Sequence, residues 1–424
     1  MNLKDIANEA LGFIQSAGLE KAQVSVSESD VQELELNESV VNLCRSTSNF
    51  SISLKAVHDS RQYQVSGNSW NEVTKKSLMA ELQEGLKASS QDEAYDILPE
   101  SYKKEFSGPM NSIDMKEALS KIMEHSKSVA KRFPKLRIRT FPFQVVHDKS
   151  VLVNSNGLEL SQEESYCDYT SMFSGEDDGK VGSFNYVGRT TRTLPKDFSE
   201  GIRLDHLYDL AEKEPHAIAY DQEVKGDLIL TPYVIPSFLS FILSQLSSSS
   251  LISGSSLFKD RLGKEILSKK FTLSSDPFGQ NFGSDAPFNS EGVLLEKGNI
   301  IEEGKLNQFL LDVYGSKKLK LPISKVTATH LSIAPGDSSL EDLIKNTKKG
   351  LLLLRFSGGS PSANGDFSGV AKNSFLIEDG KISMPIKEAM ISGNIVDVFN
   401  QITEVSKDVV SNGRTIYPWL KSRL

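Results

Sequence analysis

The fold of the chain is decided by residues 350–387, GLLLLRFSGGSPSANGDFSGVAKNSFLIEDGKISMPIK, in which strand-like runs alternate with turns. The dipeptide Asp379-Gly380 is typical of a tight turn, because both residue types tolerate turn backbone conformations. Strand signals of this kind dominate the sequence from Phe271 onward. The sequence therefore predicts a β-rich C-terminal domain, which we place at residues 222–424.

The N-terminal half combines amphipathic helices with strands that expose one face. Apolar residues follow one helical stripe between Leu3 and Ile14, and from Val24 the pattern changes to alternation with polar residues. Such alternation is typical of antiparallel sheets with one solvated face. We expect a helix–strands–helix unit at residues 1–88, and a long helix with antiparallel strands at residues 112–200. The predicted fold class is α+β: an N-terminal α/β region with helices packed on an antiparallel sheet, then a β-rich domain.

Local patterns also predict individual elements in both halves. In the first half they are three strands at residues 136–140, 143–147 and 151–153, a hairpin turn at Asn156-Gly157, and a Gly- and Asp-rich loop at residues 174–188. In the second half they are helices at residues 235–246, 257–267, 339–349 and 395–405.

Composition excludes several classes of protein. The 424 residues carry a formal net charge of −8, which argues against a grip on nucleic acid by a basic face. The two cysteines, Cys44 and Cys167, cannot form a disulfide scaffold or a four-cysteine zinc site. The one long segment without charge, residues 228–258, contains two prolines and a serine run, which disfavour a membrane span. We therefore expect a cytoplasmic protein that does not enter a membrane.

The sequence contains no familiar catalytic motif. It has no H-E-x-x-H helix, no Walker A loop and no G-x-S-x-G elbow. The richest local feature is FSGGSPSANGDFSG, Phe356–Gly369, which we call the Gly-rich segment. Such a composition is typical of a flexible loop between strands. It also frees backbone N–H groups that could bind an anion or an extended peptide, so both interpretations stay open.

The C-terminal motifs resemble the signature of the TldD/TldE family, whose TldE branch is also called PmbA. The matching parts are the run Asn364–Ser368, the hairpin FLIEDGKISMP at Phe375–Pro385 and the run Ile391–Asn394. Upstream, SDPFGQNFGSDAPFNSEGV, LNQFLLDVYGSKKL and SIAPGDSSLEDLI are similar to further family blocks. The N-terminal half is a weaker match that keeps the same general course.

The resemblance implies that this chain carries no zinc of its own. TldD subunits resemble zinc metallopeptidases in which two histidines of an H-E-x-x-x-H helix and a distant cysteine hold the metal. At the matching helix positions this chain has Ser240, Phe241 and Gln245, and no cysteine follows Cys167. Hydroxyl, phenyl and amide groups do not make a tetrahedral zinc site or a general base. We therefore assign no catalytic and no metal-binding residue here, and expect the zinc on a TldD-like partner.

The same resemblance implies a peptide-binding role and an oligomer. TldD/TldE assemblies are similar to a closed shell that an unfolded or modified peptide enters, and an extended peptide would add to a sheet edge. The implied partner is a TldD-like subunit in a heterodimer, or a second copy in a homodimer. The peptide-contacting residues we expect lie in the Gly-rich segment, at Gly358, Gly359, Asn364, Asp366 and Phe367.

Two alternatives remain at the level of sequence. The chain could be an independently active peptidase or other hydrolase with an unrecognised site. It could also be a non-enzymatic modulator of DNA gyrase, a role associated with an older name of the family. The net charge of −8 does not favour the second alternative, because it provides no evident DNA-binding face.

Overall fold

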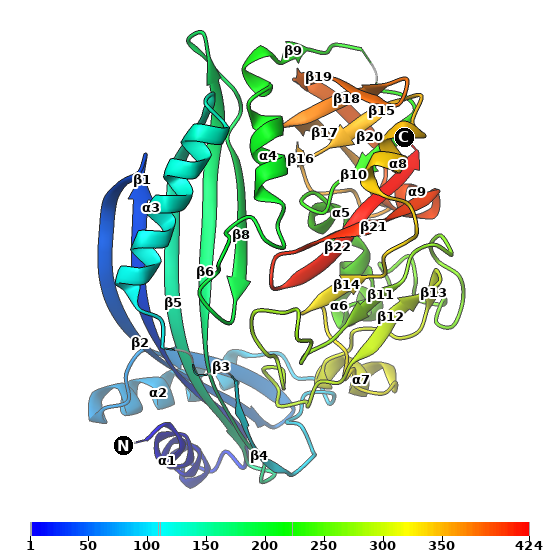
Figure 1. The fold of residues 1–424 in the computed structure, drawn as a ribbon. Coiled ribbons are helices and arrows are strands. Elements are labelled where there is room, and N and C mark those ends of the chain that lie inside the picture. The colour runs from blue at the N-terminus through cyan, green and yellow to red at the C-terminus, as the bar shows by residue number, and fades with distance from the viewer. Residues whose placement is uncertain (1, 109, 111, 223, 424) are drawn as a thin grey trace.

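The computed structural model describes residues 2–108, 110, 112–222 and 224–423. It consists of a strongly curved N-terminal sheet and a C-terminal half built around a second, larger sheet (Figure 1). Helices lie against both sheets, and most strand pairs are antiparallel. This arrangement confirms the predicted α+β class.

The N-terminal sheet has the strand order β3-β2-β1-β5-β6-β4, and the short strands β7 and β8 pair with β6. Only β4 is parallel to its neighbour, β6. The strands are β1 (Lys21–Asn37), β2 (Val40–His58), β3 (Arg61–Gly67), β4 (Lys103–Ser107), β5 (Leu136–Asn154), β6 (Glu159–Asp177), β7 (Lys180–Val181) and β8 (Asn185–Thr191). Because β1 pairs with β5 along most of its length, the stretches 1–88 and 112–200 belong to one sheet.

Four helices accompany this sheet: α1 (Leu3–Ser16), α2 (Glu72–Ala88), α3 (Met115–Arg132) and α4 (Leu204–Ala211). The start of α1 is capped by Asn2, whose side chain accepts from the backbone N–H of Asp5 at 2.7 Å. At the start of α2, Asn71 and Thr74 form a capping box. The apolar stripe of α1 is buried as predicted, at Leu3, Ala7, Ala10 and Ile14.

Two predictions in the first half are wrong. Residues 136–153 belong to one 19-residue strand, β5 (Leu136–Asn154), rather than to three strands. The ladder from β5 to β6 skips Phe141 and Pro142, so Pro142 lies where pairing with β6 lapses while β5 continues on β1. Residues 174–188 are not a loop, because β6 continues to Asp177 and a tight turn at Asp178-Gly179, with φ of 49° and 72°, leads into β7.

The C-terminal sheet has the order β13-β12-β11-β14-β22-β10-β15-β18-β19-β9, with β21 on β22, and a separate sheet has the order β16-β17-β20. The strands are β9 (Ile218–Ala219), β10 (Asp227–Leu230), β11 (Leu273–Ser275), β12 (Gly298–Glu302), β13 (Lys305–Leu306), β14 (Leu331–Ile333), β15 (Lys349–Leu353), β16 (Arg355–Gly358), β17 (Asp366–Lys372), β18 (Ser374–Glu378), β19 (Lys381–Lys387), β20 (Ala389–Asn394), β21 (Glu404–Ser411) and β22 (Thr415–Arg423). This confirms the β-rich second half.

The helices of the second half are short: η1 (a 3₁₀ turn, Glu214–His216), α5 (Ile235–Gln245), α6 (Ser248–Ser253), α7 (Val313–Leu319), α8 (Leu340–Lys345) and α9 (Ile395–Asn400). The helix predicted at 257–267 does not form. That segment is a series of turns with Leu257 and Leu262 exposed and Gly263 at a φ of 76°. The helices predicted at 339–349 and 395–405 are real but end earlier, because β15 and β21 begin within those ranges.

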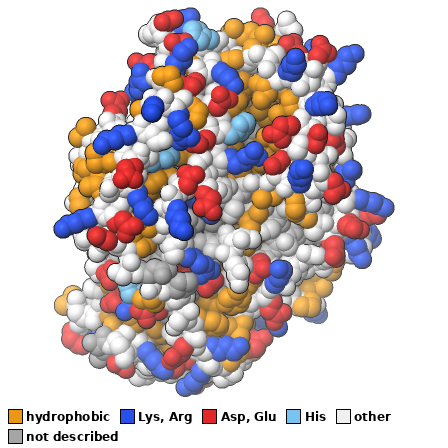
Figure 2. Space-filling model, in the orientation of Figure 1, with side chains coloured by type: hydrophobic (Ala, Val, Ile, Leu, Met, Phe, Trp, Pro, Cys, Tyr) orange, Lys and Arg blue, Asp and Glu red, His pale blue; other side chains and the backbone are white. Residues whose placement is uncertain are grey.

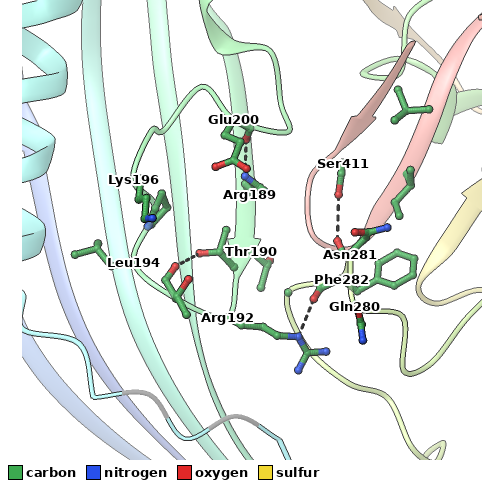
Figure 3. Close-up of a pocket in the computed structure, with 16 residues that line it drawn as sticks. Arg189, Thr190, Arg192, Leu194, Lys196, Glu200, Gln280, Asn281, Phe282 and Ser411 are labelled. Atoms are coloured by element: carbon green, nitrogen blue, oxygen red, sulfur yellow. Dashed lines mark hydrogen bonds between the residues drawn. The ribbon is translucent and has the colours of Figure 1, made fainter. Parts of the chain in front are cut away.

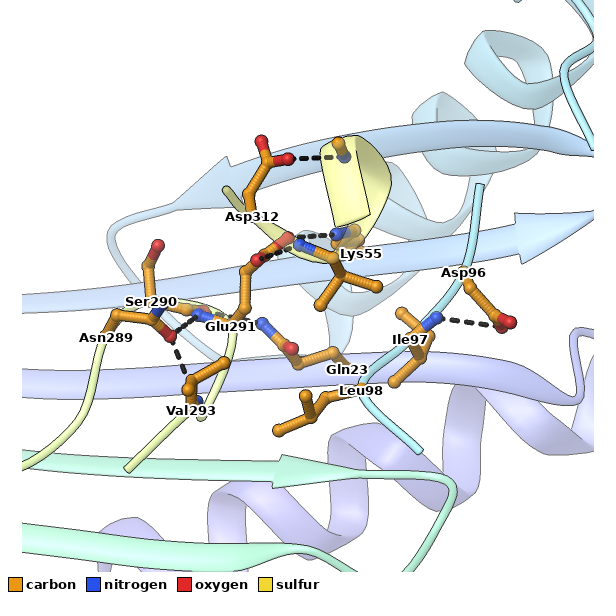
Figure 4. A network of polar contacts seen from close by, with 12 residues as sticks. Gln23, Lys55, Asp96, Ile97, Leu98, Asn289, Ser290, Glu291, Val293 and Asp312 are labelled. Carbon is orange, nitrogen blue, oxygen red and sulfur yellow. Dashed lines mark hydrogen bonds and ion pairs between the residues drawn. The ribbon is translucent and has the colours of Figure 1, made fainter. Parts of the chain in front are cut away.

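The two halves share contacts and a core. One hydrophobic cluster contains Phe143 of the first half together with Phe375 and Trp419 of the second. Figure 4 shows a polar network at another part of the junction, where Gln23 Nε2 donates to the carbonyl of Ser290 at 2.9 Å.

Glu291 is the centre of the same network. Its Oε2 accepts from the backbone N–H of Val313 at 2.8 Å, and its Oε1 lies 3.7 Å from Lys55 Nζ (Figure 4). Burial raises the pKa of Glu291 above its ordinary value. The strands β1 and β2 are therefore fixed directly to residues 290 and 291, and through Glu291 to the start of α7.

The surface gives no sign of a single dominant charge. On the face drawn in Figure 2, Lys and Arg side chains alternate with Asp and Glu. Among the residues that the structure describes, no helix is both long and apolar enough to cross a membrane.

Candidate functional site

The helix α5 forms one wall of the candidate site. Pro236 stands in its first turn, where no backbone N–H is needed for a helix hydrogen bond, and the helix ends at Gln245 with Leu246 as its C-cap. Its predicted apolar stripe is buried at Ile235, Phe238, Leu239 and Ile242, and Phe241, which the stripe did not include, is buried as well. The opposite side presents small hydroxyl residues to solvent, among them Ser237 and Ser240.

The three positions that the resemblance marked on α5 do not converge. Ser240 is exposed, and its Oγ donates to the carbonyl of Ser237 at 3.0 Å. Phe241 is buried and offers only hydrocarbon. Gln245 is buried, and its Oε1 accepts from the backbone N–H of Leu257 at 2.9 Å. These residues do not fit a zinc ion, since they supply neither the donor types nor a common direction. Within the described part of the chain, no three His, Cys, Asp or Glu side chains cluster as metal ligands would.

The Gly-rich segment forms the facing wall. It is a hairpin whose strands β16 and β17 pair from Arg355↔Lys372 to Gly358↔Gly369, and β20 pairs with the other edge of β17. In this three-stranded sheet β16 is an edge strand. The segment is therefore both a hairpin and an exposed edge, rather than an unstructured loop.

A network of amides and a carboxylate holds the tip of this hairpin. Asp366 Oδ2 accepts from Asn364 Nδ2 at 2.8 Å, and its Oδ1 accepts from Asn394 Nδ2 at 2.9 Å. These two bonds hold the pKa of Asp366 below its ordinary value. Asn394 also donates to the carbonyl of Asn364 at 2.8 Å, and its Oδ1 caps α9 by accepting from Val396 N–H at 2.9 Å. Asn364 and Asp366 thus shape the turn and tie it to α9.

Three phenyl rings close the space between the two walls. The ring of Phe367 meets those of Phe238 and Phe356 edge-to-face, at centroid distances of 5.1 and 5.6 Å. Phe238 and Phe356 lie 5.4 Å apart in a tilted arrangement. Beneath the hairpin tip, a Cβ on Gly365 would lie 3.1 Å from the ring of Phe241, so the tip packs closely on α5.

Together these elements enclose an open cavity of about 390 Å³, which we call the α5 groove. Its lining contains hydroxyl, glycine and aromatic groups and no ionisable side chain: Ser237, Phe238, Ser240, Phe356, Ser357, Gly358, Gly359, Ser360, Pro361, Phe367 and Ile395. The α5 groove offers apolar contact and hydrogen bonds, and it holds no residue equipped for acid–base or nucleophilic chemistry.

The structure brings together some of the predicted residues. Gly358, Gly359, Phe367 and Ser240 line the α5 groove, whereas Asn364 and Asp366 support its rim from behind. Phe241 lies under the hairpin tip, and Gln245 does not line the cavity.

Sequence reasoning missed several lining residues. Phe238 and Phe356 are the main ones, and Pro361 and Ile395 are two more. The signal for Phe238 was present in the apolar stripe of α5. Nothing local indicated that this stripe meets a hairpin more than one hundred residues later in the chain.

Comparison with known proteins gives a family match in the second half of the chain. Residues 223–423 match the PmbA/TldA metallopeptidase C-terminal domain. The metalloprotease PmbA of Escherichia coli O157:H7 is 30% identical over 206 residues, which is 47% of this chain and 46% of that protein. A metalloprotease PmbA homolog of Buchnera aphidicola is 27% identical over 267 residues, 61% of this chain and 58% of that protein. The chain thus spans about half the length of the curated relatives it matches.

The similarity of fold extends beyond residues 223–423 to nearly the whole chain. The crystal structure of TldE from Thermococcus kodakarensis superposes with a TM-score of 0.82 at 21% identity, and covers 99% of this chain and 98% of that one. At this identity the match establishes the fold over nearly the whole chain.

Proposed function

Because its C-terminal half makes the chain a member of the TldD/TldE (PmbA) family, we propose that it is the TldE/PmbA-like subunit of a zinc metallopeptidase system. In this proposal the chain binds peptide and completes an assembly with a TldD-like subunit, which brings the zinc. The observation that carries the proposal is the α5 helix. Its three metal-equivalent positions are an exposed hydroxyl, a buried phenyl and an amide already bonded to Leu257.

We propose that the α5 groove is where an extended, uncharged peptide segment lies. The edge strand β16 runs beside the groove and can pair with an added strand through its backbone. The phenyl rings of Phe238, Phe356 and Phe367 give an apolar side chain a surface to contact. Since no charged group lines the groove, affinity depends little on sequence, as an enzyme for unfolded or modified peptides requires.

The proposal also covers where the assembly is located and how the two subunits share the reaction. We place the assembly in the cytoplasm, with one copy of this chain paired to the zinc-bearing subunit. In this assembly the two subunits divide the work. This chain holds the peptide in position, and the zinc-activated water of the partner performs hydrolysis.

The test is reconstitution of the two chains. The purified chain alone, the TldD-like chain of its host alone and the co-expressed pair are compared for zinc by elemental analysis and for cleavage of an unfolded peptide. We expect the zinc to be stoichiometric only where the TldD-like chain is present, and cleavage to need the pair.

Variants of both chains sharpen the result. Phe367→Ala in this chain should lower cleavage by the pair, whereas the exposed control Ser244→Ala, which lies on α5 outside the groove lining, should not. Cleavage by this chain alone, together with one zinc per chain, would refute the proposal and favour an independent peptidase.

A further inference from the structure

A second and larger cavity lies at the junction of the two halves. It has a volume of about 640 Å³ and is enclosed by residues 189–196 at the end of β8, residues 280–283, and the strands β21 and β22 (Figure 3). We call it the junction cavity. The proposed function makes no use of it, and none of its lining residues belongs to the α5 groove.

Three cationic side chains line the junction cavity: Arg189, Arg192 and Lys196. Arg192 is compensated, because its guanidinium donates to both carboxylate oxygens of Asp285, at 2.6 and 3.3 Å. Its Nε also donates to the carbonyl of Phe282 at 3.0 Å (Figure 3). Arg192 therefore joins the two halves and fixes one wall of the cavity.

The charges of Arg189 and Lys196 are not compensated in this way. Arg189 donates to the backbone carbonyl of Glu200 at 2.5 Å, and no carboxylate of the described residues forms an ion pair with it. Its Nε is buried and has no hydrogen-bond partner in the described part of the chain. Lys196 is exposed at the cavity and has neither an ion pair nor a hydrogen bond among the described residues. No carboxylate of the described residues pairs with Arg189 or Lys196, so an anion bound at the cavity would gain charge-assisted hydrogen bonds that the chain itself does not supply.

The walls of the junction cavity are built by close backbone packing. A Cβ on Gly201 would lie 2.7 Å from the guanidinium carbon of Arg189 and 2.9 Å from the carbonyl oxygen of Ser411. A Cβ on Gly413 would lie 1.9 Å from the carbonyl oxygen of Thr190. Neither glycine can be replaced without moving a wall, so the cavity and its Arg189 are preorganised.

Apart from Glu200, the rest of the lining is apolar or neutral. Leu194, Pro195, Phe282, Val409 and Ile416 provide hydrocarbon surface. Glu200 is the one acidic residue of the lining, and its side chain is exposed. A bare inorganic ion would leave this apolar surface unused, whereas an organic acid would cover it.

We propose that the junction cavity binds a small organic acid, whose carboxylate meets Arg189 and Lys196 and whose carbon skeleton contacts the apolar lining. Guanidinium and ammonium groups form charge-assisted hydrogen bonds with carboxylates, which are stronger than neutral ones. The net charge of −8 repels anions at long range, so binding depends on these two local charges. A ligand here would contact both halves of the chain at once.

The test uses matched probes on the full chain: succinate, its uncharged diamide succinamide, and inorganic phosphate, each titrated calorimetrically at constant ionic strength. We expect saturable binding of succinate, and binding of both other probes weaker by tenfold or more. Lys196→Gln should weaken succinate binding by about tenfold, the loss of one charge-assisted bond. Lys104→Gln, an exposed lysine on β4 outside the cavity, is the control and should change nothing.

Because Lys196 is exposed and unpaired, its variant should keep the wild-type melting temperature, so loss of binding cannot be blamed on misfolding. A second variant, Arg189→Gln, should also reduce succinate binding. No detectable succinate binding, equal affinity for succinate and succinamide, equal affinity for phosphate, or equal effects of Lys196→Gln and Lys104→Gln would each overturn the proposal.

Discussion

Replacing Phe367 with leucine tests whether the phenyl rings of the α5 groove serve peptide binding as well as stability. The ring of Phe367 is 5% exposed and makes edge-to-face contacts with Phe238 and Phe356. Leucine keeps most of the buried hydrocarbon and loses both aromatic contacts. Each such contact is worth about 0.5–1.5 kcal/mol, so we expect Phe367→Leu to lower the free energy of unfolding by about 1–3 kcal/mol.

A matched control separates stability from binding. Phe271 is fully buried in the same core, and its ring meets that of Phe399 edge-to-face at 5.1 Å, away from the groove. Phe271→Leu loses one such contact and should destabilise the second half by about 0.5–1.5 kcal/mol. Urea unfolding followed by the fluorescence of Trp419, which is buried in the second half, measures both variants.

The decisive measurement is peptide affinity. A fluorescently labelled, unfolded peptide with apolar side chains is titrated with each variant, and its anisotropy gives the dissociation constant. Loss of one aromatic contact with the peptide, about 0.5–1.5 kcal/mol, weakens binding roughly two- to tenfold for Phe367→Leu. Phe271→Leu should bind like the wild type. Equal weakening by both variants would mean that affinity merely follows stability, and wild-type affinity in Phe367→Leu would mean that the peptide does not contact this ring.

Four further predictions concern the surroundings of the groove and the junction of the halves. Asn394→Ala removes the cap of α9 and the two bonds to the hairpin tip, so it should cost about 1–2 kcal/mol in urea unfolding; Asp366→Ala should lower peptide affinity while the circular dichroism spectrum stays unchanged. Gln245→Ala should cost about 1 kcal/mol by removing the bond to Leu257 N–H, and peptide affinity should stay at the wild-type value if the residue is purely structural. Burial raises the pKa of Glu214 to about 8 from 4.5, so its stabilising proton is fully present below pH 4.5 and is lost as the pH rises through 8, with a slope of up to about 1.4 kcal/mol per pH unit. Glu214→Gln should abolish this slope, and urea midpoints of the variant and the wild type that change equally between pH 5 and pH 8 would contradict the assignment.

Elements with strong local periodicity could be predicted from the sequence, and elements fixed by distant partners could not. The stripe from Leu3 to Ile14 gave α1 because a helix needs only its own residues and one sheet to cover. The apolar spacing of residues 257–267 suggested a helix as well, yet Leu257 and Leu262 are exposed, so that spacing did not reflect a buried face. Residues 174–188 looked like a loop because glycine and aspartate mark the turn. The pairing of β6 with β8 that flanks this turn is visible only in the folded chain.

In the candidate site, too, local features could be predicted from the sequence and contacts with distant residues could not. The glycine-rich composition of the Gly-rich segment indicated a connection between two strands, and the segment does join the paired strands β16 and β17. The composition did not predict that Asn394, about thirty residues further along, supplies two bonds to the hairpin tip. Asn364 and Asp366 therefore shape the site rather than line it, and the lining comes from Gly358 and Gly359, whose backbone is exposed at the groove.

The position of Gln245 decides how α5 should be understood. A helix that had only lost its metal ligands would leave the former ligand positions pointing into a shared empty space. In α5, Ser240 faces the groove, while Gln245 turns away and accepts from Leu257 N–H, which fixes the turn segment after α6. Ser256 Oγ, in turn, donates to the carbonyl of Gln245 at 2.6 Å. The two positions now perform different structural tasks, and the side of α5 that remains available to a ligand is the serine and phenylalanine wall of the groove. The peptide binding that we propose therefore rests on this wall and on the β16 edge beside it, since neither requires a metal ion.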